Sequence, residues 1–166
     1  MTLLEVINNL KNIASQQPNV RTVTEGDVYN EMNTNPSVVY DVFHLTQQTH
    51  AEDEDFDYYR FNLFYVSRLV DDYDNRLQIQ SIGKSVLSKI ITTFCDQFEL
   101  DFPDNTQLTY VSFTEKFIDL CAGVYCNVVF QIPKDLVCDE DEEPGLEITS
   151  NGYYWINGTK VKVEVQ

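Results

Sequence analysis

The sequence predicts an α+β fold in which an antiparallel β-sheet of about four strands carries two α-helices packed on one face. Two kinds of pattern predict it: two long segments with apolar residues at helical spacing, and several segments with apolar residues at every second position. Their order along the chain is helix, strand, strand, helix, strand, strand, which is typical of an α+β sandwich. A C-terminal β-hairpin extension is predicted after this core.

The first helix is predicted over residues 2–16. Thr2 and Glu5 have the spacing of a capping box, which satisfies free backbone amides at the start of a helix. One apolar stripe contains Leu3, Val6, Ile7, Leu10, Ile13 and Ala14. Pro18 ends the helix.

The first two strands are predicted over residues 37–47 and 58–70, where strand-forming residues are frequent. Before them, Asp27 is expected to cap a short helical turn that extends through Met32. Residues 51–57 are interpreted as an acidic turn. This order predicts an antiparallel hairpin, although the loop is longer than the favoured two to five residues.

The second helix is predicted over residues 77–98. Gly83 lies in its apolar stripe and costs about 1 kcal/mol compared with alanine, so we expect it to let the helix approach the sheet closely. The third and fourth strands are predicted over residues 108–117 and 124–132. The fourth has the clearest period-two alternation in the chain, and Pro133 ends it.

The composition changes after this point, so three segments are predicted: an α+β core at 1–134, an acidic linker at 135–145 and a β-hairpin extension at 146–166. Asn157-Gly158 is a strong turn signal for that hairpin. An isolated hairpin is only marginally stable in water. We therefore expect it to pack on the core or to add to the sheet of a neighbouring subunit.

The hairpin carries the residues predicted for self-association or partner contact. They are Tyr153, Tyr154, Trp155, Val161, Val163 and Val165. Aromatic residues are frequent at the centre of protein interfaces. Covering the core of their own subunit stays open as an equal alternative.

The formal net charge of −16 predicts repulsion from nucleic-acid phosphates and from anionic membrane surfaces. No apolar run approaches about 18 residues, and the chain begins with an amphipathic helix instead of a leader peptide. These features predict a soluble protein made in a cytoplasm. The cysteines are interpreted as reduced core residues, Cys95 in a helix and Cys126 in a strand.

No enzyme activity and no cofactor are predicted. The chain has two histidines, with His44 in a strand pattern and His50 in the acidic turn. A pair between a histidine and Cys121 or Cys126 stays open as a minor alternative, because no local signature supports it.

No metal ligands are predicted either. Acidic clusters at 52–57, 71–74 and 139–143 lack the spacing of a calcium loop. They are interpreted as solvated charged loops, and cation binding by them is left open. The spacing of Cys121 and Cys126 lacks the second pair that a zinc site needs.

Short phrases over residues 1–133 resemble the tail terminator and tail completion family of tailed bacteriophages. In order they are Gly26-Asp27, Asn35-Pro36, Leu69-Val70-Asp71, Asn75-Arg76-Leu77-Gln78 with Ser81, and the run from Phe117 to Val124. Asn151-Gly152-Tyr153 followed by Lys160-Val161-Lys162-Val163 is similar to an extension found on various phage virion proteins.

The resemblance implies a virion structural protein, made in the host cytoplasm, that forms a neck or tail ring joining tail to head. It implies a homo-oligomer, expected to be a hexamer, that contacts other neck or tail proteins and has no catalytic residues. DNA would pass through an acidic lumen without sequence-specific binding, because like charges repel. The alternative function is an acidic DNA mimic that binds and inhibits a host nucleic-acid-binding factor.

Overall fold

The computed structural model describes residues 1–35, 37–70, 75–100, 107–134, 153–156 and 159–162. Contacts between Cα atoms divide the chain into two units, Met1–Lys134 and Asp135–Gln166. The first unit contains helices and a mixed sheet, and the second contains one β-hairpin. The predicted α+β class is therefore correct.

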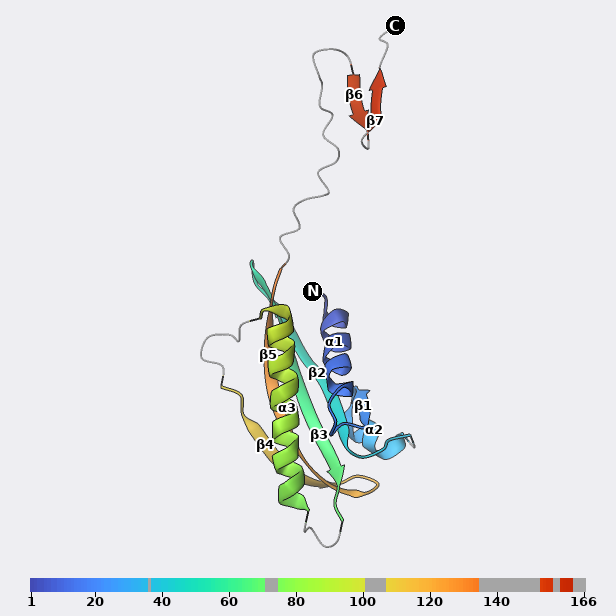
Figure 1. Cartoon of the computed structure of the whole chain (residues 1–166), viewed down its shortest axis with the longest axis vertical. Coiled ribbons are helices and arrows are strands. Elements are labelled where there is room, and N and C mark those ends of the chain that lie inside the picture. Colours follow the sequence, from blue (N-terminus) through green and yellow to red (C-terminus); the bar gives the residue numbers. More distant parts are fainter. Residues whose placement is uncertain (36, 71–74, 101–106, 135–152, 157–158, 163–166) are drawn as a thin grey trace. The chain divides into compact units, whose positions relative to one another are not determined.

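The sheet of the first unit has five strands in the order β1-β2-β3-β5-β4 (Figure 1). Their bounds are β1 Thr22–Glu25, β2 Val42–Glu52, β3 Phe56–Arg68, β4 Tyr110–Lys116 and β5 Leu120–Pro133. β2, β3, β5 and β4 pair antiparallel, whereas β1 runs parallel to β2. The expectation of about four antiparallel strands was wrong in this respect, because the edge strand β1 was not predicted.

β1 was missed because it is four residues long and carries threonines and a glutamate instead of an apolar alternation. Side-chain hydrogen bonds help to hold it in place. The Thr22 hydroxyl donates to the Val39 carbonyl over 2.8 Å and accepts from the Val39 amide over 3.0 Å. Such tertiary hydrogen bonds give no signal in the local pattern.

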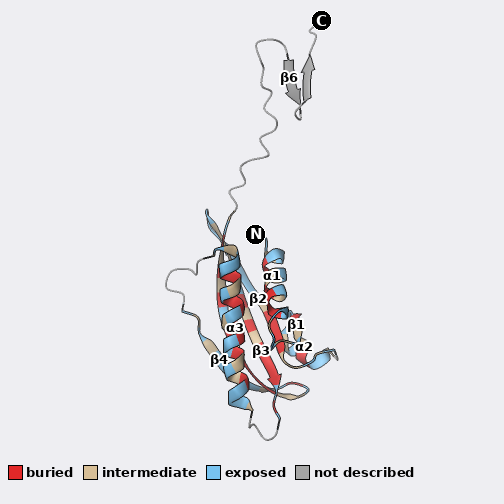
Figure 2. Cartoon of the chain, viewed as in Figure 1, coloured by how far each residue is buried: buried red, intermediate tan, exposed pale blue. Residues whose placement is uncertain are grey.

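Two helices cover one face of this sheet, as predicted. α1 (Leu3–Ser15) and α3 (Arg76–Phe98) lie side by side over it (Figure 1). The predicted capping box is present: the Thr2 amide donates to Glu5 Oε2 over 2.7 Å, and the Glu5 amide donates to Thr2 Oγ1. Buried residues follow the sides of both helices that face the sheet and run along β3 (Figure 2).

Gly83 has the role that the sequence predicts. A Cβ atom at this position of α3 would lie 2.8 Å from Cδ1 of Tyr65 on β3, closer than van der Waals contact permits. The absent side chain lets the helix approach the sheet. None of the helices in the described part of the chain is long and apolar enough to span a membrane.

A third helix, α2 (Val28–Thr34), belongs to the opposite face. Asp27 caps it by accepting the Asn30 amide over 2.8 Å, so the predicted turn is a helix of seven residues. Met32 packs there in a second, smaller hydrophobic cluster together with Val42, Val66, Phe117 and Cys121. The sheet therefore has α1 and α3 on one face and α2 on the other. The sequence predicted helices on one face only.

The second unit contains β6 (Tyr153–Ile156) and β7 (Thr159–Lys162), which pair antiparallel with Tyr154 opposite Val161 and Trp155 opposite Lys160. A hairpin was predicted at this place. The turn residues 157–158, the acidic linker and the predicted contact residues Val163 and Val165 lie outside the described residues.

Candidate functional site

Aromatic side chains gather on the sheet face opposite α1 and α3. We call them the aromatic face, which consists of Tyr29, Phe64, Phe113, Phe117 and Tyr125. The ring centroids of Phe64 and Tyr125 lie 5.6 Å apart, and those of Tyr29 and Phe117 lie 5.5 Å apart. With Val28 and Glu115 they line a hollow of about 170 Å³. This volume is below the 300–1,000 Å³ usual for small-molecule sites and suits one or two protruding side chains.

Strand register builds the aromatic face. Phe64 of β3 lies directly opposite Tyr125 of β5, and Phe113 of β4 lies opposite Gly123 of β5. A Cβ atom on Gly123 would lie 2.6 Å from Cζ of Phe113 and would also meet the backbone carbonyl oxygen of Tyr65. The glycine therefore leaves the space that the Phe113 ring occupies.

The margin of the aromatic face is open. Tyr29 is 55% exposed and Ile118 is 67% exposed. The neighbouring strand β4 pairs only with β5 within the described residues, so it forms one edge of the sheet and leaves its other side unpaired. Val111 of β4 is 39% exposed on the same face as Phe113. An apolar patch beside an unpaired strand edge is typical of a protein-interaction surface.

A second group of functional side chains lies at the tip of the β2–β3 hairpin. The predicted acidic turn at 51–57 is shorter than expected, because β2 continues to Glu52 and β3 begins at Phe56. The Asp53 carboxylate organises the remaining turn, with Oδ1 accepting the Asp55 and Phe56 amides over 3.0 and 2.8 Å. Oδ2 accepts the Tyr58 hydroxyl over 2.7 Å, and these hydrogen bonds lower the pKa of Asp53.

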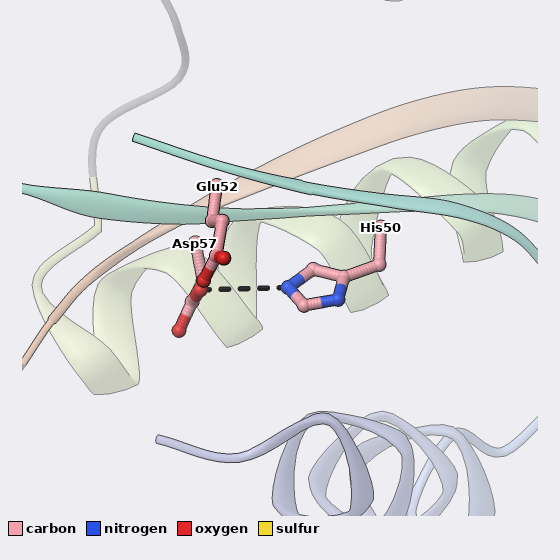
Figure 3. Close-up of side chains that lie close together, drawn as sticks. All are labelled: His50, Glu52 and Asp57. Atoms are coloured by element: carbon pink, nitrogen blue, oxygen red, sulfur yellow. Dashed lines mark hydrogen bonds and ion pairs between the residues drawn. The ribbon is translucent and has the colours of Figure 1, made fainter. Parts of the chain in front are cut away.

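His50, Glu52 and Asp57 point toward one another beside this turn (Figure 3). His50 and Glu52 come from β2 and Asp57 from β3, and one potential ligand atom from each lies within 4.8 Å of the others. His50 Nε2 is 3.4 Å from Asp57 Oδ1. We call these three residues the His50 cluster. The sequence predicts His50 in a turn, whereas in the structure it lies on strand β2.

A β-bulge brings His50 into this cluster. Gln47 lies opposite Phe61 and His50 lies opposite Tyr59, so β2 contains one extra residue between these pairs. Because successive strand residues alternate between faces, the extra residue moves His50 to the face on which Phe61 and Tyr59 are buried. Without the bulge it would share the other face with His44.

His44 lies elsewhere and is completely buried. Its Nδ1 lies 2.8 Å from Thr24 Oγ1, and its Nε2 lies 3.2 Å from the Gly26 carbonyl oxygen. Neither Cys121 nor Cys126 is among its hydrogen-bond partners. The partner of His50 Nε2 is Asp57, so neither histidine forms a hydrogen bond with Cys121 or Cys126, and the pair left open by the sequence is not formed.

The cysteines that the structure describes behave as core residues. Cys95, Cys121 and Cys126 are all buried. Burial raises the pKa of the Cys126 thiol to about 11 and also raises that of Cys121. Both thiols are therefore protonated at neutral pH, which makes them poor nucleophiles and poor metal ligands.

The sequence signalled neither the aromatic face nor the His50 cluster as a site. The backbone of Tyr153, Tyr154, Trp155 and Val161, the residues predicted for association, lies in the β6–β7 hairpin. A comparison with protein-family models and with curated proteins found no match to this chain.

Proposed function

We propose that this protein is a structural subunit that assembles with copies of itself into a ring in the neck or tail of a tailed bacteriophage. The observation that carries the proposal is the aromatic face beside the unpaired edge of β4. At this margin of the described core, the exposed apolar side chain of Val111 lies on an edge strand whose outer backbone groups are unpaired. A second copy of the chain that covers this margin would bury the exposed apolar side chains and would also pair the free backbone groups of β4.

Three further observations support the same function. The α+β core contains the element order that the phage tail terminator resemblance implies, with β1 and α2 added before the first hairpin. The hollow of the aromatic face has room for a protruding side chain of a partner, and its volume lies below the range usual for small-molecule sites. The net charge of −16 would keep DNA from adhering to the ring as it passes through.

Within this proposal the subunits form a hexamer that joins tail to head and contacts other neck or tail proteins. The β6–β7 hairpin contributes to these contacts through the residues around Trp155. The protein has no catalytic role in it, and its place in the cell is the assembled virion. The proposed chemistry of assembly is burial of apolar area, which stabilises by roughly 25 cal/mol per Å².

Light scattering coupled to size-exclusion chromatography tests the proposal. We expect the full chain to form a closed oligomer whose population rises with protein concentration. Val111→Asp places a charge on the open margin and is expected to shift the protein toward monomer. Leu4→Asp is the matched control, because Leu4 is 65% exposed on α1 and lies outside the aromatic face.

Two results would count against the proposal. One is a monomer at every concentration tested, with no assembly upon addition of phage neck or tail proteins. Under that result, retention of a host DNA-binding protein on the immobilised chain would favour the acidic DNA mimic. The other is an oligomer that Val111→Asp leaves intact, which would place the contact elsewhere.

A further inference from the structure

We propose that the His50 cluster binds one divalent transition-metal ion, of which Zn²⁺ is the representative, and that the ion joins β2 to β3 at the tip of their hairpin. The inference is independent of the proposed function. It rests on the convergence of one imidazole and two carboxylates from two strands (Figure 3).

The donor set fits such an ion. Zinc is bound by histidine nitrogen and carboxylate oxygen at about 2.0–2.2 Å, so tetrahedral ligand atoms lie about 3.3 Å apart. His50 Nε2 and Asp57 Oδ1 already lie 3.4 Å apart. The third ligand atom, on Glu52, lies within 4.8 Å of the others, a gap that rotation of one exposed side chain closes. Two carboxylates balance the charge of the ion, and water would complete the coordination.

The imidazole decides which class of ion the site prefers. An oxygen-only set would suit Ca²⁺ or Mg²⁺, whereas histidine nitrogen favours ions of the zinc and nickel type. The His50 ring is also held in place, because it stacks on Tyr59 with ring centroids 4.9 Å apart and planes inclined by 27°. A ligand fixed before binding loses less conformational freedom when the metal arrives.

Two neighbouring side chains compete for the ligands, Tyr59 at Asp57 and Lys134 at Glu52, and the second carboxylate oxygen of Asp57 can serve the Tyr59 hydroxyl. Lys134 Nζ lies 3.4 Å from Glu52 Oε2, but it also donates to the Asp53 carbonyl over 2.6 Å. The ammonium group thus keeps a partner when Glu52 turns to the metal. The Asp53 carboxylate accepts three hydrogen bonds within the turn and does not belong to the ligand set. Its charge and that of Glu54 attract a cation to the tip.

Titration of the metal-free full chain with Zn²⁺, followed by calorimetry, tests the inference. We expect one Zn²⁺ per chain at this site and much weaker binding of Ca²⁺. His50→Ala and Asp57→Asn should each weaken Zn²⁺ binding by at least about tenfold. Glu54→Gln is the matched control, because it removes the same charge from the same turn without removing a ligand, and its affinity should stay close to that of the wild type.

Nuclear magnetic resonance of the wild-type chain locates the ion without any substitution. The protein has two histidines, so Zn²⁺ should shift the imidazole signals of His50 and leave those of buried His44 unchanged. Unmoved His50 signals, or Zn²⁺ binding that persists in His50→Ala, would overturn the inference. An equal loss in Glu54→Gln would also overturn it, by showing that a diffuse acidic field, and not a ligand set, attracts the ion.

Discussion

His44 is held by hydrogen bonds at both of its ring nitrogens while completely buried between β1 and β2. The neutral ring with a proton on Nε2 satisfies both contacts: the Thr24 hydroxyl donates to Nδ1, and Nε2–H donates to the Gly26 carbonyl. A second proton on Nδ1 would place a positive charge in the core, where water cannot solvate it. Burial therefore lowers the pKa of His44, and the hydrogen bond to the Gly26 carbonyl and nearby carboxylates oppose this effect.

This contact makes stability depend on pH. Because the pKa of His44 is lower in the folded chain than the ordinary value of about 6.5, the unfolded chain binds more protons below that pH. The free energy of unfolding should therefore fall as the pH falls below about 6.5, by at most about 1.4 kcal/mol per pH unit from this residue. Urea unfolding at a series of pH values measures this change in the free energy of unfolding.

His44→Gln serves as the comparison, since glutamine also offers one donor and one acceptor but does not titrate. We expect this variant to lose the part of the pH dependence that lies just below pH 6.5. An unchanged pH profile in His44→Gln would show that the dependence originates in other groups.

The position of one histidine could be predicted from the sequence, and the position of the other could not. Strand-forming neighbours place His44 on a strand from the sequence alone. The position of His50 depends on a bulge between Gln47 and His50, and no turn-type residue marks it. Its cluster also requires the register that places Glu52 opposite Asp57. The predicted turn covers residues 51–57. A turn limited to residues 53–55 would have placed Glu52 and Asp57 on paired strands, and their pairing could then have been predicted.

The C-terminal end of α3 offers a test at the scale of an element. Glu99 ends the helix with φ 52° and ψ 41°, the left-handed conformation that glycine adopts most easily. Its amide and that of Leu100 both donate to the Cys95 carbonyl. Glu99→Gly should raise the free energy of unfolding by about 0.5–1 kcal/mol, because the strain of the glutamate exceeds the added freedom of the unfolded glycine.

Gln97→Gly provides the matched control for this change. Gln97 is exposed in the last turn of α3, where glycine should lower the free energy of unfolding by about 0.5 kcal/mol. Chemical denaturation of both variants therefore separates the effect of the left-handed position from the general effect of glycine. A loss of stability in both variants would contradict the strain argument.

Helices and strands could be predicted from the sequence where the residues within each element determine it. The capping box and apolar stripe of α1, and the alternation of β5, are contained in their own residues. α2 was foreseen only as a turn, although its cap was recognised at Asp27. The aromatic face was not foreseen, because Phe64 and Phe113 come together only through the pairing of three strands.

At the scale of the whole molecule, the chain divides into two compact units, Met1–Lys134 and Asp135–Gln166, and the first has a hydrophobic core of its own. The buried residues of the first unit lie between Val6 and Ile132, and β5 ends at Pro133. The part after Lys134 has eight acidic and two basic residues, a net charge of −6 out of −16. Removing this part leaves a net charge of −10 on the core. The repulsion between like charges within the chain is then smaller.

A chain that ends at Lys134 should therefore fold cooperatively with an unfolding midpoint close to that of the full chain. Its self-association should be weaker, because an isolated hairpin is marginal in water and the proposed assembly gives β6–β7 a partner. Circular dichroism measures the first expectation and analytical ultracentrifugation the second. Equal association by both chains would confine the contact to the aromatic face and the β4 edge, whereas loss of folding would show that the core depends on residues after 134.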